Sequence, residues 1–427
     1  MVSIKTFRGI TYNKDKVKDF SKVITPPNDV ISKDGKESFK NKSPYNFVNL
    51  ILPGEEGNKF ELAAELLQKW QQEKVLLQDE KETIYIYSES YLVDGKEVGR
   101  VGFISLIELE DLGKGVLPHE KILEKDLKNR ISLISTTKAH FGIPFVLYDD
   151  KEKIIDAFIA SEISGKEPYM EFTDGSGVTH KLWKTSGQEF IDKVKIEMNK
   201  YQCIIADGHH RYTSALKVKE SLGIDEAGYA PICFVNSFNE GMVILPTNRV
   251  VFGLEKVNIQ SFIDKLKEYF EVEEISDVFE LVDRVSDTKI LIDKETNLKN
   301  HVFGVYSNLD KKSYFLRLKD NNVLDSILPN DTDIYKKLDV NILHKIIIEK
   351  ILGISEEKQT NRENIDFVKG NKETVKRMED SEMQFAFFVN PPLMREVFLT
   401  ARANETMPQK STYFYPKVFS GLVVYKF

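Results

Sequence analysis

The stretch from Cys203 to Leu222 constrains the fold more than any other part of this 427-residue chain. Cys203 to Ala206 is a short apolar run rich in β-branched residues, which is typical of a buried strand. Asp207-Gly208 predicts a tight turn, and the apolar residues that follow recur at roughly helical spacing until Gly223 ends the pattern. The sequence therefore predicts a strand, a glycine turn and a helix in direct succession.

This turn is suited to binding an anion. A helix that begins just after a glycine turn directs free backbone N–H groups and the positive end of its dipole at whatever lies over it. His209, His210 and Arg211 stand on the first turn and add donors that can hold phosphate or carboxylate. A capped or core histidine would explain one such residue, but a run of polar residues beside a strand end is costly to bury without a ligand. We interpret the turn as a binding site.

The same turn resembles the signature turn of the ParB/sulfiredoxin superfamily, among whose members the free-serine kinases are closest in sequence. The chain as a whole resembles the uncharacterised-domain family 1015. The segments that carry this second resemblance are Pro26-Pro27-Asn28-Asp29-Val30-Ile31, Asn46-Phe47-Val48, Pro118-His119-Glu120, the Asp207 turn, Leu245-Pro246-Thr247, Leu338-Asp339-Val340, and Met407 to Lys417. They cover nearly the full length. The resemblance implies nucleotide or phosphate binding at the turn and, for some members, phosphorylation of free L-serine.

The pattern along the chain predicts an α+β fold with two domains. Residues 1–252 are expected to form a ParB/sulfiredoxin-like mixed-sheet core, catalytic or phosphate-binding, with an N-terminal elaboration. Helices and strands alternate from residue 253, which indicates a second α+β domain over 253–427. We expect its tail to return to the site; the alternative is a tail strand ordered by pairing with a sheet. Asn46 to Leu52 alternates and predicts a strand.

A second group of charged residues lies between Pro118 and Arg130. His119 and Glu120 could supply a base, and Lys121 with Arg130 could clamp anionic groups. The alternative is a solvated, charged start of a helix. Relatives usually carry an acidic residue before the arginine, and the Asn129 found here argues against a metal or proton-transfer role at that position.

The C-terminal signature contains Lys410-Ser411-Thr412, a lysine next to two hydroxyls. Phosphate sites use this combination, but no glycine-rich loop precedes it, so it is not a P-loop. Relatives commonly carry histidine where this chain has Asn248, which keeps a polar group and removes the ability to take a proton. Arg249 beside it faces either a pocket or solvent.

Phosphoryl transfer needs a positive clamp, usually Mg²⁺, and a carboxylate that accepts the proton of the attacking hydroxyl. Asp207 is predicted to bind Mg²⁺ or to act as the base, and Glu120 is the preferred base. The residues predicted to be catalytic are Glu120, Asp207, His209 and His210, and those predicted to bind phosphate or substrate are Gly208, Arg211, His119, Lys121, Arg130, Lys410, Ser411 and Thr412.

The resulting hypothesis is a free L-serine kinase that makes O-phosphoserine from pyrophosphate, ADP or ATP. The absence of a glycine-rich nucleotide fingerprint favours a small donor such as pyrophosphate. A rival from another class is a ParB-like nucleotide-sensing protein that switches a partner interaction without catalysis. A third reading, phosphatase or nuclease, needs the same residues with water as the acceptor.

Composition limits the remaining options. With 60 basic and 67 acidic side chains the net charge is −7, which argues against broad nucleic-acid binding. Cys203 and Cys233 are the only cysteines, and their apolar surroundings predict buried thiols in a reducing compartment. No apolar run reaches the length of a membrane span and no leader pattern opens the chain, so we expect a cytoplasmic protein without a membrane partner.

Overall fold

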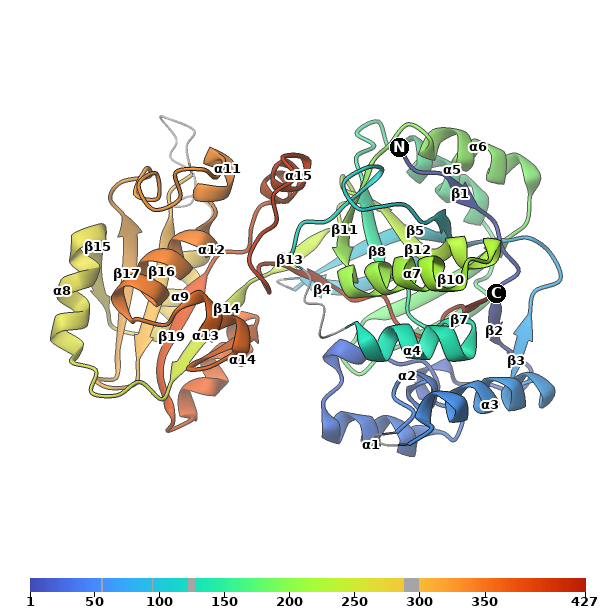
Figure 1. The fold of residues 1–427 in the computed structure, drawn as a ribbon, viewed down its shortest axis with the longest axis horizontal. Coiled ribbons are helices and arrows are strands. Elements are labelled where there is room, and N and C mark those ends of the chain that lie inside the picture. Colours follow the sequence, from blue (N-terminus) through green and yellow to red (C-terminus); the bar gives the residue numbers. More distant parts are fainter. Residues whose placement is uncertain (55–56, 94, 122–126, 288–298) are drawn as a thin grey trace. The chain divides into compact units, whose positions relative to one another are not determined.

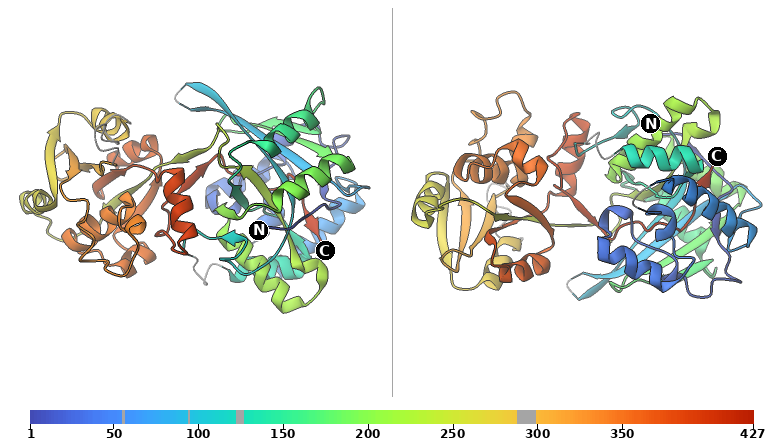
Figure 2. Two further views of the ribbon diagram at one scale, coloured as in Figure 1. Left: turned by 90° about the horizontal axis from the view of Figure 1, so that it is seen from above. Right: turned by 60° about the horizontal axis from the view of Figure 1, so that its bottom comes forward.

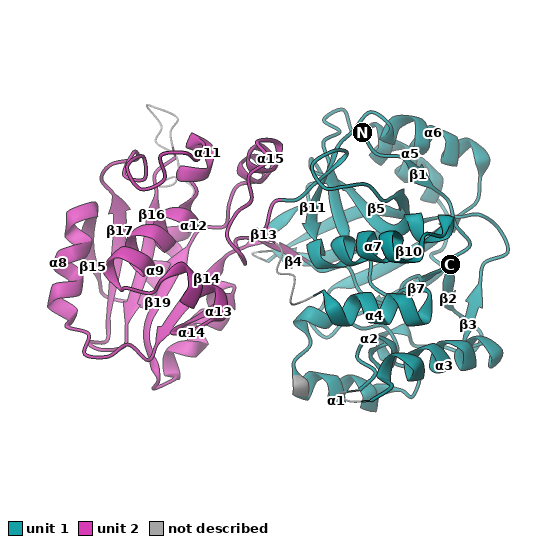
Figure 3. Ribbon diagram, viewed as in Figure 1, with its two compact units in different colours: residues 1–118, 122–243, 416–427 teal, residues 119–121, 244–415 magenta. Residues whose placement is uncertain are grey.

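The computed structural model describes residues 1–54, 57–93, 95–121, 127–287 and 299–427. The chain divides into two compact units (Figure 3). Unit 1 contains residues 1–118, 122–243 and 416–427, and unit 2 contains residues 119–121 and 244–415. Both units combine helices with sheets, so the predicted α+β class is confirmed. No helix among the described residues is both long and apolar enough to cross a lipid bilayer.

Unit 1 is built on a nine-stranded mixed sheet (Figure 1). Its strands are β1 (Ile4–Lys5), β4 (Ile84–Val93), β5 (Lys96–Glu108), β6 (Val116–Leu117), β8 (Phe145–Tyr148), β9 (Met170–Thr173), β10 (Thr179–Thr185), β11 (Cys203–Asp207) and β12 (Tyr229–Asn236). Their order is β6-β11-β8-β12-β5-β4-β10-β9, and β1 pairs with β5. β11 runs parallel to β6 and antiparallel to β8. β6 pairs with Cys203 and Ile204, whereas the pairing with β8 extends to Asp207 and holds that end of the strand in place.

Helices and short strand pairs complete unit 1. They are η1 (Phe20–Lys22), η2 (Asn28–Val30), α1 (Lys33–Lys42), α2 (Val48–Ile51), α3 (Lys59–Gln72), α4 (Lys128–Thr137), α5 (Ile154–Ile163), α6 (Gln188–Met198), α7 (His209–Leu222), η4 (Asp225–Gly228), β2 (Ile10–Tyr12) paired with β3 (Leu76–Gln78), and β7 (Ala139–His140) paired with β21 (Tyr425–Lys426). α7 packs against α4, and α4 packs against α3 (Figure 1). Both chain termini belong to this unit (Figure 2).

The predicted strand, turn and helix around residue 207 are confirmed as β11, Gly208 and α7. All the apolar residues of β11 are buried, and Cys203 and Ile205 share one core cluster with Tyr212 and Ala215 of α7. Both cysteines are buried free thiols, also as predicted. Burial of this strand explains why its apolar run carries no alternation, since both of its faces are covered.

The strand predicted over Asn46 to Leu52 is wrong, because the chain forms the short helix α2 there. The side-chain oxygen of Asn46 accepts a hydrogen bond from the N–H of Val48 at 3.0 Å, and its amide donates to the carbonyl of Lys22 at 2.7 Å. These hydrogen bonds favour the start of a helix over an extended strand at this position. Val48, Leu50 and Ile51 are buried, so a pattern read as alternation also fits one helical turn.

Unit 2 is built on a six-stranded antiparallel sheet in the order β15-β17-β16-β19-β14-β18. Its strands are β14 (Thr247–Phe252), β15 (Phe270–Ile275), β16 (Val302–Ser307), β17 (Lys312–Leu318), β18 (Ile365–Lys369) and β19 (Met383–Val389). β13 (Val243–Leu245) and β20 (Tyr413–Tyr415) form a separate pair, and the helices are α8 (Ile259–Tyr269), α9 (Val278–Ser286), α11 (Asp333–Lys336), α12 (Asp339–Ile342), the π-helix η5 (Leu343–Ile351), α13 (Glu356–Asn361), α14 (Asn371–Lys376), η6 (Arg377–Glu379) and α15 (Met394–Arg402).

Both faces of this sheet are covered. Alternate residues of the strands enter two apolar clusters, as the two-residue period of a strand requires. Val251, Phe385 and Phe387 join the cluster that contains residues of α8 and η5, whereas Val250 and Ala386 join the cluster that contains residues of α9. Odd-numbered positions of β14 therefore face the η5 side.

Candidate functional site

The turn at Gly208 holds the end of β11 against the start of α7. Gly208 has φ 98°, a left-handed conformation that costs glycine little. A Cβ at this position would lie 3.0 Å from Pro144 Cα and 3.0 Å from Arg211 Nε. Both the backbone conformation and this close approach require glycine, so the chain can bring Asp207 and Arg211 together within one turn.

Asp207 is held between two cations. One of its carboxylate oxygens accepts a hydrogen bond from Arg211 Nη2, and the other accepts one from Lys417 Nζ. Arg211 also donates from Nη1 to the carbonyl of Ile143 at 2.7 Å. Burial alone would raise the pKa of Asp207, but the charges of Lys417 and Arg211 outweigh burial and hold the pKa well below its usual range. Asp207 is thus an ionised anchor for the two cations.

This arrangement makes a prediction about acid stability. A carboxyl whose pKa is lowered by folding adds stability above its unfolded pKa of 3.8, and the contribution disappears as the pH falls toward the folded pKa. We expect Asp207→Asn to lower the free energy of unfolding near pH 7 and to cost clearly less at about pH 2, where the folded carboxyl begins to take up its proton. Urea unfolding at both values measures this, with Asp111→Asn, an exposed partner of Lys114, as the control. An equal loss at both values would contradict the ion-pair account.

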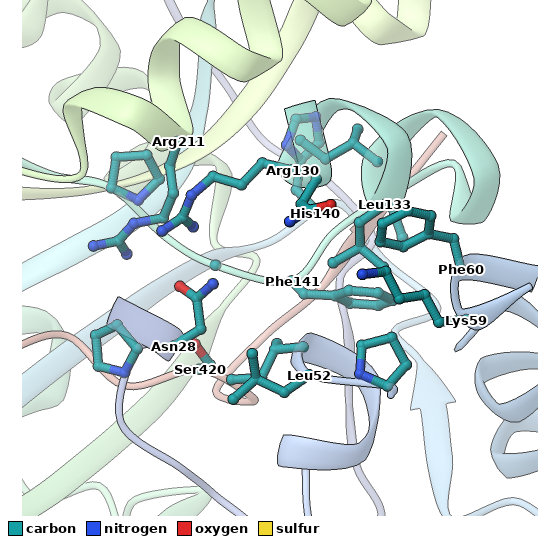
Figure 4. A pocket seen from close by; sticks show the side chains of 18 of the residues that line it. Asn28, Leu52, Lys59, Phe60, Arg130, Leu133, His140, Phe141, Arg211 and Ser420 are labelled. Atoms are coloured by element: carbon teal, nitrogen blue, oxygen red, sulfur yellow. The ribbon is translucent and has the colours of Figure 1, made fainter. Parts of the chain in front are cut away.

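The start of α7 lies at a pocket of unit 1 with a volume of about 170 Å³ (Figure 4). Arg211 reaches it from α7, Arg130 from α4 and Lys59 from α3, while Asn28 of η2 and Ser420 add polar groups. No carboxylate occurs among the described residues that line it. In Figure 4 the guanidinium groups of Arg130 and Arg211 lie toward one end, with the amide of Asn28 below them.

The other end of the pocket is mostly apolar, with Lys59 beside the apolar side chains (Figure 4). Leu52, Phe60, Leu133 and Phe141 form this part of its lining (Figure 4). Burial lowers the pKa of His140 to about 4, so this imidazole is neutral at pH 7 and is not one of the cations of the pocket. A cationic end joined to an apolar wall suits a ligand that carries an anionic group on a larger, less polar body.

The residues predicted to form the binding site at the turn lie in different surroundings. Arg211 and Arg130 line the pocket together. His209 is buried and contributes to the low pKa of Asp207, whereas His210 is half-buried on the same helical turn. Gly208 has a conformational role as described above. Catalytic roles for the two histidines stay predictions.

The structure assigns the other predicted residues to unit 2, where segments near residues 120 and 410 meet. Glu120 forms a parallel β-bridge with Met407, and its Oε1 accepts a hydrogen bond from the N–H of Lys410 at 2.6 Å. His119 is fully buried, and its Nε2 lies 2.8 Å from Thr412 Oγ1. These pairs join two groups that the sequence predicted separately.

Two further residues of this set have other partners. Lys121 is exposed and pairs with Glu356 at 3.3 Å. Ser411 is buried and donates from its hydroxyl to the carbonyl of Pro408 at 2.6 Å. Lys410 has φ 58°, so its backbone is left-handed. The hydroxyl of Ser411 and the backbone of Lys410 shape the loop, and roles in phosphate binding stay predictions.

The magnesium role predicted for Asp207 stays a prediction. Both of its oxygens accept hydrogen bonds from cations, and these positive charges disfavour a metal ion beside them. Across the described residues, no group of three or more histidine, cysteine, aspartate or glutamate side chains is arranged to hold a metal.

Sequence reasoning missed several residues of this site. Lys417 lies 210 positions from Asp207 in the sequence. The only signal for it was its place in the C-terminal signature, together with the need of a buried Asp207 for more than one counter-charge. Lys59, Leu52 and Phe141 carry no local signal. Pro27 and Asn28 line the pocket, and their proline-rich segment was a visible landmark.

Fold and site together define an α+β protein whose larger unit carries a cationic pocket at the start of a helix. The chain belongs to the family described as "Protein of unknown function (DUF1015)", whose sequence model matches residues 4–341. No curated protein matches it.

Similar solved structures include a free serine kinase in complex with AMP, 14% identical, covering 72% of this chain and 92% of that chain with a TM-score of 0.34. A conserved hypothetical protein from Pyrococcus furiosus is 16% identical over 72% of this chain and 90% of that chain, with a TM-score of 0.34. SbnI with a C-terminal truncation, from Staphylococcus aureus, is 11% identical over 74% and 85%, with a TM-score of 0.34.

Proposed function

We propose that this protein is a phosphotransferase that moves a phosphoryl group from a nucleotide to the hydroxyl of free L-serine. The observation that carries the proposal is the pocket of unit 1, where Arg211 from the first turn of α7 and Arg130 from the first turn of α4 line the same cavity. Guanidinium groups and the N-terminal N–H groups of a helix are the groups that proteins use to hold phosphate. Serine as the acceptor rests on the resemblance of the Asp207 turn to that of the free-serine kinases.

The apolar wall supports a nucleotide as the donor. Pyrophosphate consists only of anionic groups and gains nothing from Leu133 or Phe141. A nucleotide can place its phosphates at the guanidinium groups and its base against the apolar side chains. Of the donors that the sequence left open, ADP and ATP are therefore favoured over pyrophosphate.

The proposed reaction assigns distinct tasks to the residues. The serine oxygen bonds to the terminal phosphorus, the bond from this phosphorus to the bridging oxygen breaks, and the hydroxyl proton passes to a carboxylate. Arg130 and Arg211 stabilise the charge on the transferred group, and Asp207 keeps Arg211 in position. Glu120 is the proposed proton acceptor. Asp207 is poorer in that role because its lowered pKa makes it a weak base.

The test is a reaction with L-serine, Mg²⁺ and, in separate samples, ATP, ADP or pyrophosphate, followed by detection of phosphoserine by mass spectrometry. We expect phosphoserine with a nucleotide and little or none with pyrophosphate. Saturable nucleotide binding without any phosphorylated product would refute the kinase and favour the sensing protein. Release of free phosphate without phosphoserine would favour hydrolysis, with water as the acceptor.

A further inference from the structure

Unit 2 contains a buried arginine whose hydrogen-bond partners carry no negative charge. Arg249 lies on β14 and is 1% exposed. Its Nε donates to His344 Nε2 at 2.9 Å, and its Nη1 donates to the carbonyl of Thr247. The guanidinium also lies over the ring of Phe367, with 5.2 Å to the centroid. Among the described residues, no carboxylate lies within ion-pair distance of it.

Two donors at this place have no partner. Arg249 Nη2 and Thr247 Oγ1 are both buried without a hydrogen bond. The two residues are two positions apart on one strand, so their side chains project from the same face. The bond from Arg249 Nη1 to the carbonyl of Thr247 draws the guanidinium back toward that residue. Buried donors without acceptors are costly, and a buried charge without a counter-charge costs more.

The neighbouring titratable groups do not neutralise the buried positive charge of Arg249. Burial, with the charge of Arg249, lowers the pKa of His344 well below its usual range, so His344 accepts its bond as a neutral imidazole. Burial lowers the pKa of Arg249 to about 9, although the charge of Glu120 acts in the opposite direction. An anion bound at Arg249 would supply the missing counter-charge.

We propose that Arg249 Nη2 and Thr247 Oγ1 bind the carboxylate of a small α-amino acid in unit 2. One N–H and one O–H donor suit the two oxygens of a carboxylate. The negative charge of Glu120 acts on Arg249, so it favours a ligand that also carries an ammonium group and disfavours a phosphate dianion. The choice of L-serine as the probe rests on the proposed function, whereas the site itself does not.

Calorimetric titration of the full chain with L-serine and with L-serine amide, which lacks the carboxylate, tests this site. We expect Arg249→Gln to weaken L-serine binding about tenfold to a hundredfold and Thr247→Val about threefold to tenfold. The amide should bind the wild type weakly and should not distinguish the variants. Ser307→Ala is the matched control, because it also removes a buried hydroxyl of unit 2 that has no partner.

Thermal unfolding without ligand separates binding from folding. Thr247→Val should leave the melting temperature unchanged or raise it, because the lost hydroxyl bonds to nothing. Wild-type affinity in both variants, equal binding of L-serine and its amide, or no amino-acid binding at all would overturn the site. Carboxylate-dependent binding without phosphoserine formation would refute only the proposed function. Phosphoserine formation with an unchanged KM for serine in both variants would refute only this site.

Discussion

Arg211→Gln should lower kcat/KM for the nucleotide by about a hundredfold or more. The guanidinium of Arg211 is held by Asp207 and by the carbonyl of Ile143, so it is oriented before a ligand arrives. Glutamine is too short to keep both contacts and carries no charge, and each charge-assisted hydrogen bond to phosphate contributes about 1.5–3 kcal/mol. Steady-state kinetics and nucleotide titration measure the loss.

Loss of folding has to be separated from loss of binding in this variant, because breaking a buried ion pair is itself destabilising. Arg130→Gln serves as a second variant. Arg130 lines the same pocket, whereas the ion pairs of Asp207 are with Arg211 and Lys417. Lys217→Gln, an exposed residue of α7, is the matched control. Wild-type nucleotide affinity in both arginine variants would rule out the pocket as the phosphate site.

Glu120→Gln should lower kcat by about 10²- to 10⁴-fold and leave the affinity for the nucleotide unchanged. Glutamine keeps an oxygen that can accept the hydrogen bond from the N–H of Lys410, so the local loop should survive the change. The substitution removes the carboxylate that would accept the proton. Single-turnover kinetics with ATP and L-serine measure the effect.

Glu356→Gln is the control for this experiment, because Glu356 is an exposed carboxylate that pairs with Lys121. It should retain wild-type kcat. A Glu120→Gln enzyme with near wild-type kcat would exclude Glu120 as the base, and a different carboxylate would then have to accept the proton.

Local signals in the sequence were enough for the centre of unit 1. The apolar run, the glycine and the helical spacing from Cys203 onward each act over a few residues, and β11 and α7 follow them. Segments with consistent short-range preferences are the ones that a sequence specifies most clearly.

Long-range contacts could not be predicted in the same way. The bond from Lys417 to Asp207 and the bond from Lys410 to Glu120 each join residues more than 200 positions apart, and no local preference records such a pair. The burial of Arg249 was likewise left open, because a strand pattern alone does not say which face meets a helix. The sequence named the charged residues, while the fold determined their partners.

Crystals of the full chain grown with ADP and L-serine test the central claim most directly. The proposal predicts phosphate oxygens within hydrogen-bond distance of Arg130 and Arg211, next to the first N–H groups of α7, and the base against Phe141 and Leu133. ADP bound elsewhere on the chain, with this pocket closed by its own side chains, would contradict the account.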